Sequence, residues 1–187
     1  MKKEIRNKQA IFPMPVLLIS TFNEDGSVDV MNAAWGTMFD MDEVLLNLSS
    51  SHKTVKNIKQ RKGLVVHIAD AKHVTEADYF GMVSANNVKD KFAKTGMTYT
   101  KSEIVDAPII NEFPIAMECE FIDFNIKDEE YGVFAKVKRV SVDEEFLKDG
   151  KVDIDALEAL AFDPFTNGYY KVTNRVADAF KVGLKLK

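Results

Sequence analysis

The stretch DEVLLNLSSSHKTVKNIKQRKGLVVHIAD, residues 42–70, decides which fold this chain can adopt. Its first part, residues 42–49, is an apolar run that predicts a strand. The segment 53–63 has apolar residues at helical spacing and stops at Gly63, which suits a short helix with a glycine C-cap. Residues 64–70 then predict a second buried strand, so a strand, a serine-rich turn, a helix and a strand form one unit.

Hairpin signals flank this unit on both sides. Before it, residues 15–21 and 28–34 are apolar runs that the Asp-Gly turn of NEDGS joins, which is typical of two antiparallel strands. After it, residues 115–126 and 131–142 predict two long strands joined by a turn at DEEYG. Six predicted strands with hairpin connections favour an antiparallel barrel.

The helices that the sequence predicts are short. Residues 73–85 have helical spacing with Thr75 as N-cap, and residues 87–96 predict another short helix that ends at Gly96. A doubly wound parallel sheet needs longer crossover helices than these. The predicted fold class is therefore mainly β with short helices.

Length and composition indicate one globular domain over residues 1–187, with 46% hydrophobic and 29% charged residues. The chain has no apolar run long enough for a bilayer span, and residues 1–13 do not have the pattern of a secretion signal, so we do not expect secretion. A single cysteine, Cys119, fits a reducing cytoplasm. The net charge of −4 argues against a nucleic-acid binder, and no Gly-rich nucleotide-binding motif is present.

The serine-rich turn SSSHKT, residues 49–54, lies in the one basic stretch of this acidic chain. No acidic residue occurs between Glu43 and Asp70, whereas five lysines and arginines do. A helix N-terminus beside small hydroxyl side chains suits an anion such as a phosphate monoester. The alternative is that Ser51 or His52 caps the helix and that the lysines form a solvated helix face.

The stretch MNAAWG, residues 31–36, combines small residues with Trp35, the single tryptophan. Small residues let a backbone approach a flat ligand, and the large aromatic ring provides apolar contact area. The alternative is a barrel corner in which small residues relieve crowding and Trp35 fills core volume.

The three histidines do not have the spacing of metal ligands, so no metal site is predicted. His67 alternates with apolar Val66 and Ile68, which favours a core histidine whose hydrogen bonds are satisfied. No catalytic dyad or nucleophile motif is evident, so no catalytic side chain is predicted.

Together these stretches resemble the flavin reductase-like, FMN-binding split-barrel family, and its flavoredoxin-type members in particular. The resemblance rests on PMPVLLIST, VMNAAWG, DEVLLNLSSSHKTVKNI, ADAKHVTEADYFGMVSANNVKDKF, DAPIINEFPIAMECE and GLKLK in this order. It implies a split β-barrel that holds FMN at a homodimer interface. Carried over by position, the residues implied to bind the cofactor are Asn32, Ala33, Ala34, Trp35, Gly36, Ser49, Ser50, Ser51, His52, Lys53, Thr54, Asn57, Ser84 and Lys91.

The resemblance also implies an activity, hydride transfer from NADH or NADPH to FMN, for which the cofactor supplies the chemistry. Two alternatives stay open. One is a flavoredoxin-like electron carrier that keeps its FMN and acts with a redox protein partner. The other is a split-barrel binder of a different phosphorylated ligand, such as pyridoxal phosphate.

Overall fold

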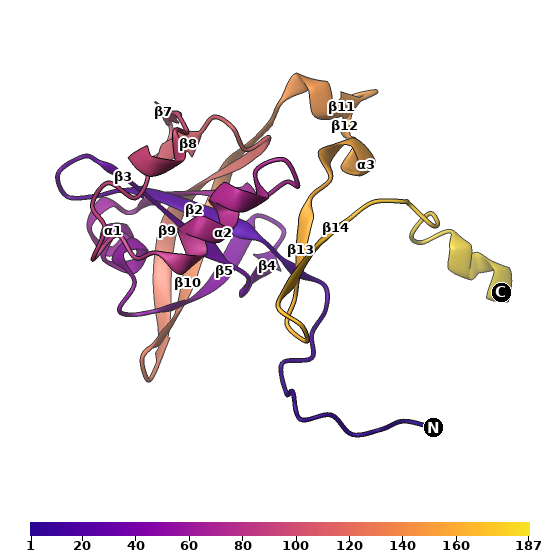
Figure 1. Cartoon of the computed structure of the whole chain (residues 1–187). Helices are drawn as coiled ribbons and strands as arrows, with labels where there is room; N and C mark the ends of the chain where they lie inside the picture. The colour runs from indigo at the N-terminus through magenta and orange to yellow at the C-terminus, as the bar shows by residue number, and fades with distance from the viewer.

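The structure is a computed structural model that describes residues 1–187, and its centre is a curled antiparallel sheet of seven strands (Figure 1). The strands follow the order β3-β2-β6-β9-β10-β5-β4, and every pairing is antiparallel. Their bounds are β2 (Leu17–Phe22), β3 (Val28–Ala33), β4 (Gly36–Asp40), β5 (Glu43–Ser49), β6 (Gly63–Ile68), β9 (Ile115–Lys127) and β10 (Glu130–Val142). The predicted fold class, mainly β with short helices, is confirmed.

The six predicted strands correspond to β2, β3, β5, β6, β9 and β10. The Asp-Gly turn between the first two is also confirmed, because Gly26 has a φ of 83° and the Asn23 N–H donates to the Ser27 carbonyl over 2.8 Å. β4 was not predicted, because it continues the chain from β3 after only two residues.

The sheet closes on itself at the junction between β3 and β4. These two strands are the opposite edges of the sheet, yet only Ala34 and Trp35 separate them in the chain. Ala33 pairs with Leu17 of β2, whereas Gly36 pairs with Leu46 of β5. The chain therefore passes from one edge of the sheet to the other at this corner, which makes the sheet a barrel that is split there.

Gly36 is required at the corner by close packing. A Cβ at this position would lie 2.6 Å from Cδ1 of Leu17 and 2.8 Å from Cδ2 of Leu46. The corner interpretation of the MNAAWG stretch is therefore confirmed, but Trp35 does not fill core volume, since it is 49% exposed.

Two layers of apolar side chains hold the barrel, and β2 contributes to both. Every residue of β2 is buried, because one face of the strand lines the barrel interior and the other lies under α2 (Val74–Met82). Val55 and Ile58 of α1 (Lys53–Arg61) pack on the interior cluster, and Ala77 and Phe80 of α2 belong to the outer cluster. The two helices thus pack on opposite faces of β2 and β3.

Three expectations about the helices are wrong. The C-cap of α1 is Lys62, with a φ of 60°; Gly63 instead begins β6, where a Cβ would lie 2.8 Å from the Asp106 backbone nitrogen. α2 begins at Val74, so Thr75 is not its N-cap. Residues 87–96 form only a 3-10 turn, η1 (Ala93–Thr95), which does end at Gly96 with a φ of 68°.

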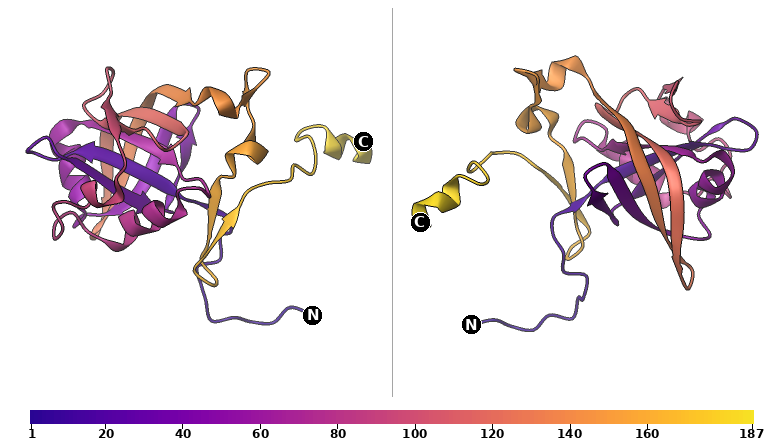
Figure 2. Two further views of the ribbon diagram at one scale, coloured as in Figure 1. Left: turned by 45° about the horizontal axis from the view of Figure 1, so that its top comes forward. Right: turned by 180° about the vertical axis from the view of Figure 1, so that it is seen from behind.

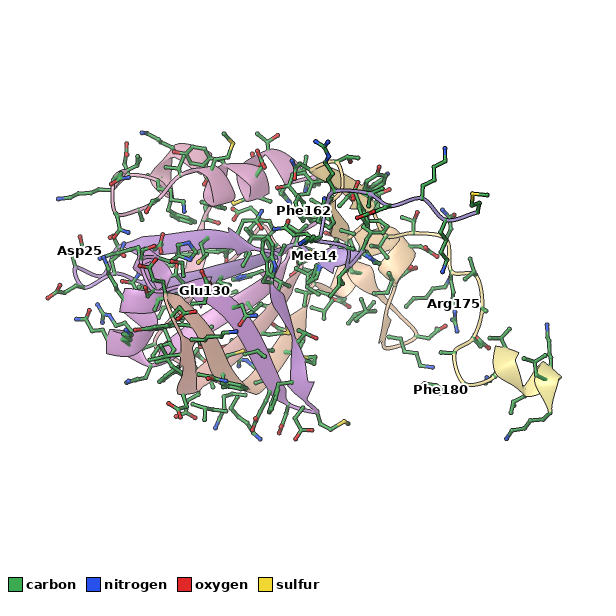
Figure 3. The ribbon with its side chains drawn as sticks, turned by 90° about the horizontal axis from the view of Figure 1, so that it is seen from below. Met14, Asp25, Glu130, Phe162, Arg175 and Phe180 are labelled. Carbon is green, nitrogen blue, oxygen red and sulfur yellow. The ribbon has the colours of Figure 1, made fainter.

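Short elements surround the barrel. β1 (Met14–Pro15), β13 (Leu160–Asp163) and β14 (Gly168–Lys171) form a small separate sheet, in which Met14 pairs with Phe162 (Figure 3). The remaining elements are β7 (Tyr99–Lys101), β8 (Pro108–Ile110), η2 (Glu144–Phe146), β11 (Leu147–Lys148), β12 (Lys151–Val152), α3 (Ile154–Leu157) and η3 (Val182–Leu186).

Both ends of the chain leave the barrel and lie away from it in all views (Figures 1 and 2). Arg175 and Phe180 lie on the C-terminal segment, well away from the labelled residues of the barrel (Figure 3), and Phe180 is fully exposed. None of the helices combines the length and the apolar character that a membrane crossing requires.

Candidate functional site

A groove runs between the β3–β4 corner, the start of α1 and the end of α2. It consists of two cavities, of about 270 and 180 Å³, that share Met31, Asn32, His52 and Gly81 in their walls. Combined, they have the size of a small-molecule site, for which about 300 to 1,000 Å³ is usual. The two cavities differ in chemistry, so the groove has an apolar part and a polar part.

The apolar part lies at the barrel corner. Ala33, Ala34 and Trp35 line it on one side, and Phe162 and Tyr169 of the small sheet line it on the other. Trp35 is anchored there through its backbone, because its carbonyl accepts a hydrogen bond of 2.8 Å from the Asn47 N–H. Small residues beside aromatic rings leave a slot that suits a flat apolar ligand.

Gly81 and Asn32 set the width of the groove where its two parts meet. The Asn32 side-chain amide donates to the Ala77 carbonyl of α2 over 2.9 Å, which draws the helix close to β3. A Cβ on Gly81 would lie 3.2 Å from the Asn32 Cβ. A side chain at position 81 would therefore narrow the groove at this point.

The polar part lies at the start of α1. His52 is the N-cap residue, and its side chain makes no capping hydrogen bond; the first turn of the helix also has no acidic residue. The interpretation that this turn serves only to cap the helix is therefore not supported by its geometry. Lys53 and Ser84 line the cavity at this point, so the first turn of the helix, a lysine and a serine border one space, which suits an anion.

Beneath the polar part lies a buried cluster of Asp29, Thr54 and Lys91, each at most 3% exposed. The Thr54 hydroxyl donates to Oδ2 of Asp29 over 2.8 Å, and the Lys91 ammonium lies 3.9 Å from Oδ1. Lys91 donates instead to the Phe80 carbonyl over 2.9 Å. Oδ1 of Asp29 is buried without a hydrogen-bond partner.

The charges of this cluster are poorly compensated. Burial raises the pKa of Asp29 above its ordinary value, although Lys91 and the Thr54 hydroxyl oppose that shift. Burial likewise lowers the pKa of Lys91, against the attraction of Asp29. Both groups therefore bear a desolvation cost that a better hydrogen-bonded pair would avoid.

His52 lines the apolar part, the polar part and a third cavity that lies over the paired strands β5 and β10. Its Nδ1 is buried and has no hydrogen-bond partner. Burial lowers the pKa of His52 below its ordinary value of 6.5, against the attraction of Glu130. The imidazole therefore presents an unused polar atom at the centre of the groove.

The groove brings together most of the residues that the sequence analysis selected. Asn32, Ala33, Ala34, Trp35, His52, Lys53, Thr54, Ser84 and Lys91 line one or both cavities. Gly36, Ser49, Ser50, Ser51 and Asn57 do not.

The residues outside the groove have other contacts. Asn57 is buried, and its amide donates to the Thr21 hydroxyl over 3.0 Å and to Asn23 Oδ1 over 2.9 Å, which ties α1 to the β2–β3 hairpin. The hydroxyls of Ser49 and Ser51 bond each other over 3.0 Å. These side chains stabilise the turn and the helix, and Thr54 combines such a role with a place in the cavity wall.

Several residues of the groove were not predicted from the sequence. Asp29 is one, because a single aspartate in a strand has no local signal for its buried surroundings. Phe162 and Tyr169 are others, because they come from the part of the chain with mixed patterns. The Tyr169 hydroxyl donates to Asp78 Oδ1 over 2.8 Å, and burial together with this bond raises the pKa of Tyr169 to about 12.

His67 is a core histidine, as predicted. It is completely buried; its Nε2 accepts from the Ile110 N–H over 3.0 Å, and its Nδ1 lies 3.2 Å from the Leu18 carbonyl. Burial lowers the pKa of His67 to about 4, so the ring is neutral at pH 7.

Residues 9–159 match the family model described as flavin reductase like domain. The chain belongs to this flavin reductase-like family. It is 32% identical to flavoredoxin of Desulfovibrio vulgaris (Miyazaki F), whose solved structure is similar with a TM-score of 0.92 over 98% of this chain and 100% of that chain.

More distant proteins are similar in structure or in sequence. The structure of flavoredoxin from Methanosarcina acetivorans is similar with a TM-score of 0.90 at 24% identity, over the full length of both chains. An uncharacterized protein of Aeropyrum pernix is 25% identical over 118 residues, which are 62% of this chain and 44% of the relative. The chain thus spans less than half of the length of that relative.

Proposed function

We propose that the groove binds FMN, with the ring system in the apolar part and the phosphate in the polar part, and that residues 1–187 act as one domain. The observation that carries this proposal is the division of a single groove in a flavin reductase-like protein. One part has small and aromatic walls at the corner 33–35, and the other has Lys53 at an uncapped helix N-terminus.

An unpaired polar atom supports the same assignment. The buried Nδ1 of His52, a residue that lines both parts of the groove, has no hydrogen-bond partner. Buried polar atoms are normally hydrogen-bonded, so this exception fits a polar ligand in the groove. Together with Lys53 and Ser84 in the wall of the polar part, it fits a phosphorylated flavin.

The proposed activity is that of an NAD(P)H-dependent oxidoreductase, in which bound FMN supplies hydride acceptance. The chain itself positions the cofactor and excludes water from the groove. Trp35 and the small corner residues limit the apolar part, Lys53 and Ser84 hold the phosphate, and Gly81 keeps the groove open. No side-chain acid or base is needed for hydride transfer, so no catalytic residue is assigned.

A second candidate function is that of an electron carrier that retains its FMN and acts with a redox protein partner. It is favoured by the 32% identity to flavoredoxin over nearly the whole chain. Both candidate functions use the same groove. They differ in whether a nicotinamide nucleotide or a redox protein partner exchanges electrons with the bound FMN.

Titration of the purified, flavin-free protein with FMN tests the binding proposal, followed by visible absorbance and fluorescence quenching. Lys53→Ala should weaken FMN affinity about tenfold or more, because a charge-assisted phosphate bond contributes roughly 1.5 to 3 kcal/mol. Lys56→Ala is the matched control, since Lys56 lies on the same helix and outside both cavities. Equal FMN affinity in both variants would contradict the phosphate assignment.

Anaerobic spectra after addition of NADH or NADPH separate the two functions. A reductase should bleach the flavin rapidly and turn over with added free FMN. A carrier should stay yellow through gel filtration and oxidise either nucleotide slowly. A protein that binds no FMN and consumes no NAD(P)H would rule out both.

We also propose that the chain forms a homodimer, since apolar side chains are exposed on the edge strand β4, on the turn that follows it and on the C-terminal segment. Phe39 is 59%, Met41 93% and Phe180 fully exposed. Exposed apolar residues along an open sheet edge are typical of an interface. Sedimentation of the full chain should show a dimer, and Phe39→Asp should weaken it. Ile104→Asp, at another exposed position, should leave the dimer unchanged. A monomeric wild-type protein would contradict the proposal.

A cytoplasmic location is proposed as well. It rests on the single cysteine, Cys119, which is free and buried. Burial raises the pKa of its thiol to about 12, so the thiol stays protonated and unreactive.

A further inference from the structure

The buried cluster beneath the polar part of the groove contains a feature that an anion site does not need. Asp29 contributes a carboxylate to the wall of the cavity that contains Lys53 and Lys91. A phosphate in that cavity would lie near the buried carboxylate of Asp29, whose Oδ1 has no hydrogen-bond partner, as well as near Lys53 and Lys91. The net attraction of the site is therefore smaller than its lysines suggest.

The geometry indicates that Asp29 competes with the ligand for Lys91. The Lys91 ammonium lies 3.9 Å from Asp29 Oδ1, which is too far for a hydrogen bond, and one of its N–H groups donates to the Phe80 carbonyl. Lys91 therefore still has donors for a phosphate oxygen. If it uses them, its attraction is divided between two anions.

Asp29 itself cannot move out of the way. Its other oxygen accepts from the Thr54 hydroxyl over 2.8 Å, and Thr54 is fixed in the first turn of α1. The carboxylate is 2% exposed, so water screens it poorly. The charged groups that face it are Lys91 from the segment after α2, and Lys53 and His52 from the start of α1.

We propose that Asp29 is a specificity-determining residue that weakens the hold of the groove on the phosphate group, so that FMN binds in an exchangeable manner. This inference rests on the proposed FMN site. It concerns the phosphate alone, because Asp29 lines the polar part of the groove and not the apolar part. Removal of the Asp29 charge should therefore tighten FMN and leave riboflavin, which has the same ring system without a phosphate, unaffected.

The test compares FMN and riboflavin affinities of the wild-type protein and of Asp29→Asn, by fluorescence titration at about pH 8, where a phosphate monoester is a dianion. Asp29→Asn should bind FMN on the order of tenfold more tightly, because a carboxylate a few ångströms from a phosphate is strongly repulsive at low screening. Riboflavin affinity should change by less than about twofold.

Two further variants sharpen the result. Asp29→Ala removes the charge without adding an amide donor, so it should also tighten FMN; tightening by Asp29→Asn alone would mean that the new amide binds the phosphate, and would overturn the proposal. Asp90→Asn is the charge-matched control, since Asp90 is exposed and pairs with Lys94. It should leave both affinities unchanged.

The readouts also separate failure of the inference from failure of the proposed function. Wild-type protein that binds neither flavin would contradict the FMN site, and with it this inference. Wild-type protein that binds FMN, together with Asp29 variants that bind FMN equally or more weakly, would overturn the inference alone. Equal tightening of FMN and riboflavin would also overturn it, because the effect would then not involve the phosphate.

Discussion

Two buried carboxylates, Glu118 of β9 and Asp29 of β3, illustrate how the same chemical group stabilises one region and leaves another incomplete. Glu118 is completely buried; Arg139 donates to both of its oxygens, and the Ser102 hydroxyl donates to Oε2. Asp29 is almost as buried, but its Oδ1 has no hydrogen-bond partner. Burial is therefore similar, and the number of donors differs.

The direction of each pKa shift agrees with the number of hydrogen bonds that the carboxylate accepts. Burial acts to raise the pKa of Glu118, but the hydrogen bonds from Arg139 and Ser102 outweigh it, so the pKa lies below the ordinary 4.5. For Asp29 burial prevails, and the pKa lies above the ordinary 3.8. A carboxylate with both oxygens hydrogen-bonded, which we call a closed network, stabilises the fold. A carboxylate with one unpaired oxygen, an open network, can still interact with a ligand.

The largest effect is expected when the closed network is broken. Glu118→Gln should lower the free energy of unfolding by about 2 kcal/mol, because it replaces charge-assisted bonds to a buried carboxylate by neutral ones. Urea unfolding at pH 7 measures this. Glu120→Gln is the control, because Glu120 lies two residues further along β9 and its ion pair with Lys138 is exposed. Loss of this ion pair should change the free energy of unfolding by less than about 0.5 kcal/mol. Equal effects would contradict the distinction.

A smaller effect is expected when the open cluster loses its one good hydrogen bond. Thr54→Val keeps the shape of the side chain and removes the hydroxyl that donates to Asp29 Oδ2. The free energy of unfolding should fall by about 1 kcal/mol, because a buried carboxylate loses a donor. The same urea titration measures it. No loss of stability would indicate that Asp29 is already protonated and no longer needs the donor.

The smallest expected effect is on the pH dependence of stability. It distinguishes Glu118 from Asp29 best, because the two groups differ in the sign of their effect. The pKa of Glu118 is lowered by folding, so its stabilisation is present above about pH 4.5 and is lost as the pH falls through the folded-state value. The pKa of Asp29 is raised, so its contribution is present below about pH 3.8 and is lost as the pH rises through the folded-state value. The two groups therefore act in opposite directions in acid.

Urea midpoints measured through the acid range should separate these contributions. Relative to the wild-type protein, Glu118→Gln should flatten the rise of stability with pH, and Asp29→Asn should steepen it. Parallel curves for the two variants would mean that the difference in donors does not control the titration of these groups.

The fold was predictable to the extent that it depends on local patterns. The apolar runs at 15–21, 42–49 and 64–70 became β2, β5 and β6, because alternation and turn residues act over a few neighbours. β4 was missed because its pattern adjoins β3 without a turn. The segment 87–96 formed only a 3-10 turn, since short polar stretches have little intrinsic preference that packing cannot override.

The residues of the candidate site were predictable in part, and through the family resemblance more than through spacing. The turn with Lys53 and the corner with Trp35 had signals of their own, and both line the groove. Asn57 was implied by the resemblance alone, and its amide hydrogen-bonds to the β2–β3 hairpin. A helical residue's sequence position gives its face, but not the partner that its polar atoms find.

The sequence by itself determined the hairpins and the basic character of the start of α1, because each depends on residues close in the chain. Only the tertiary structure decided that Asp29 lies beside Lys91 and that Tyr169 closes the groove. The physical reason is that sheet order brings distant segments together, and the environment that they create sets whether a buried charge is satisfied or left for a ligand.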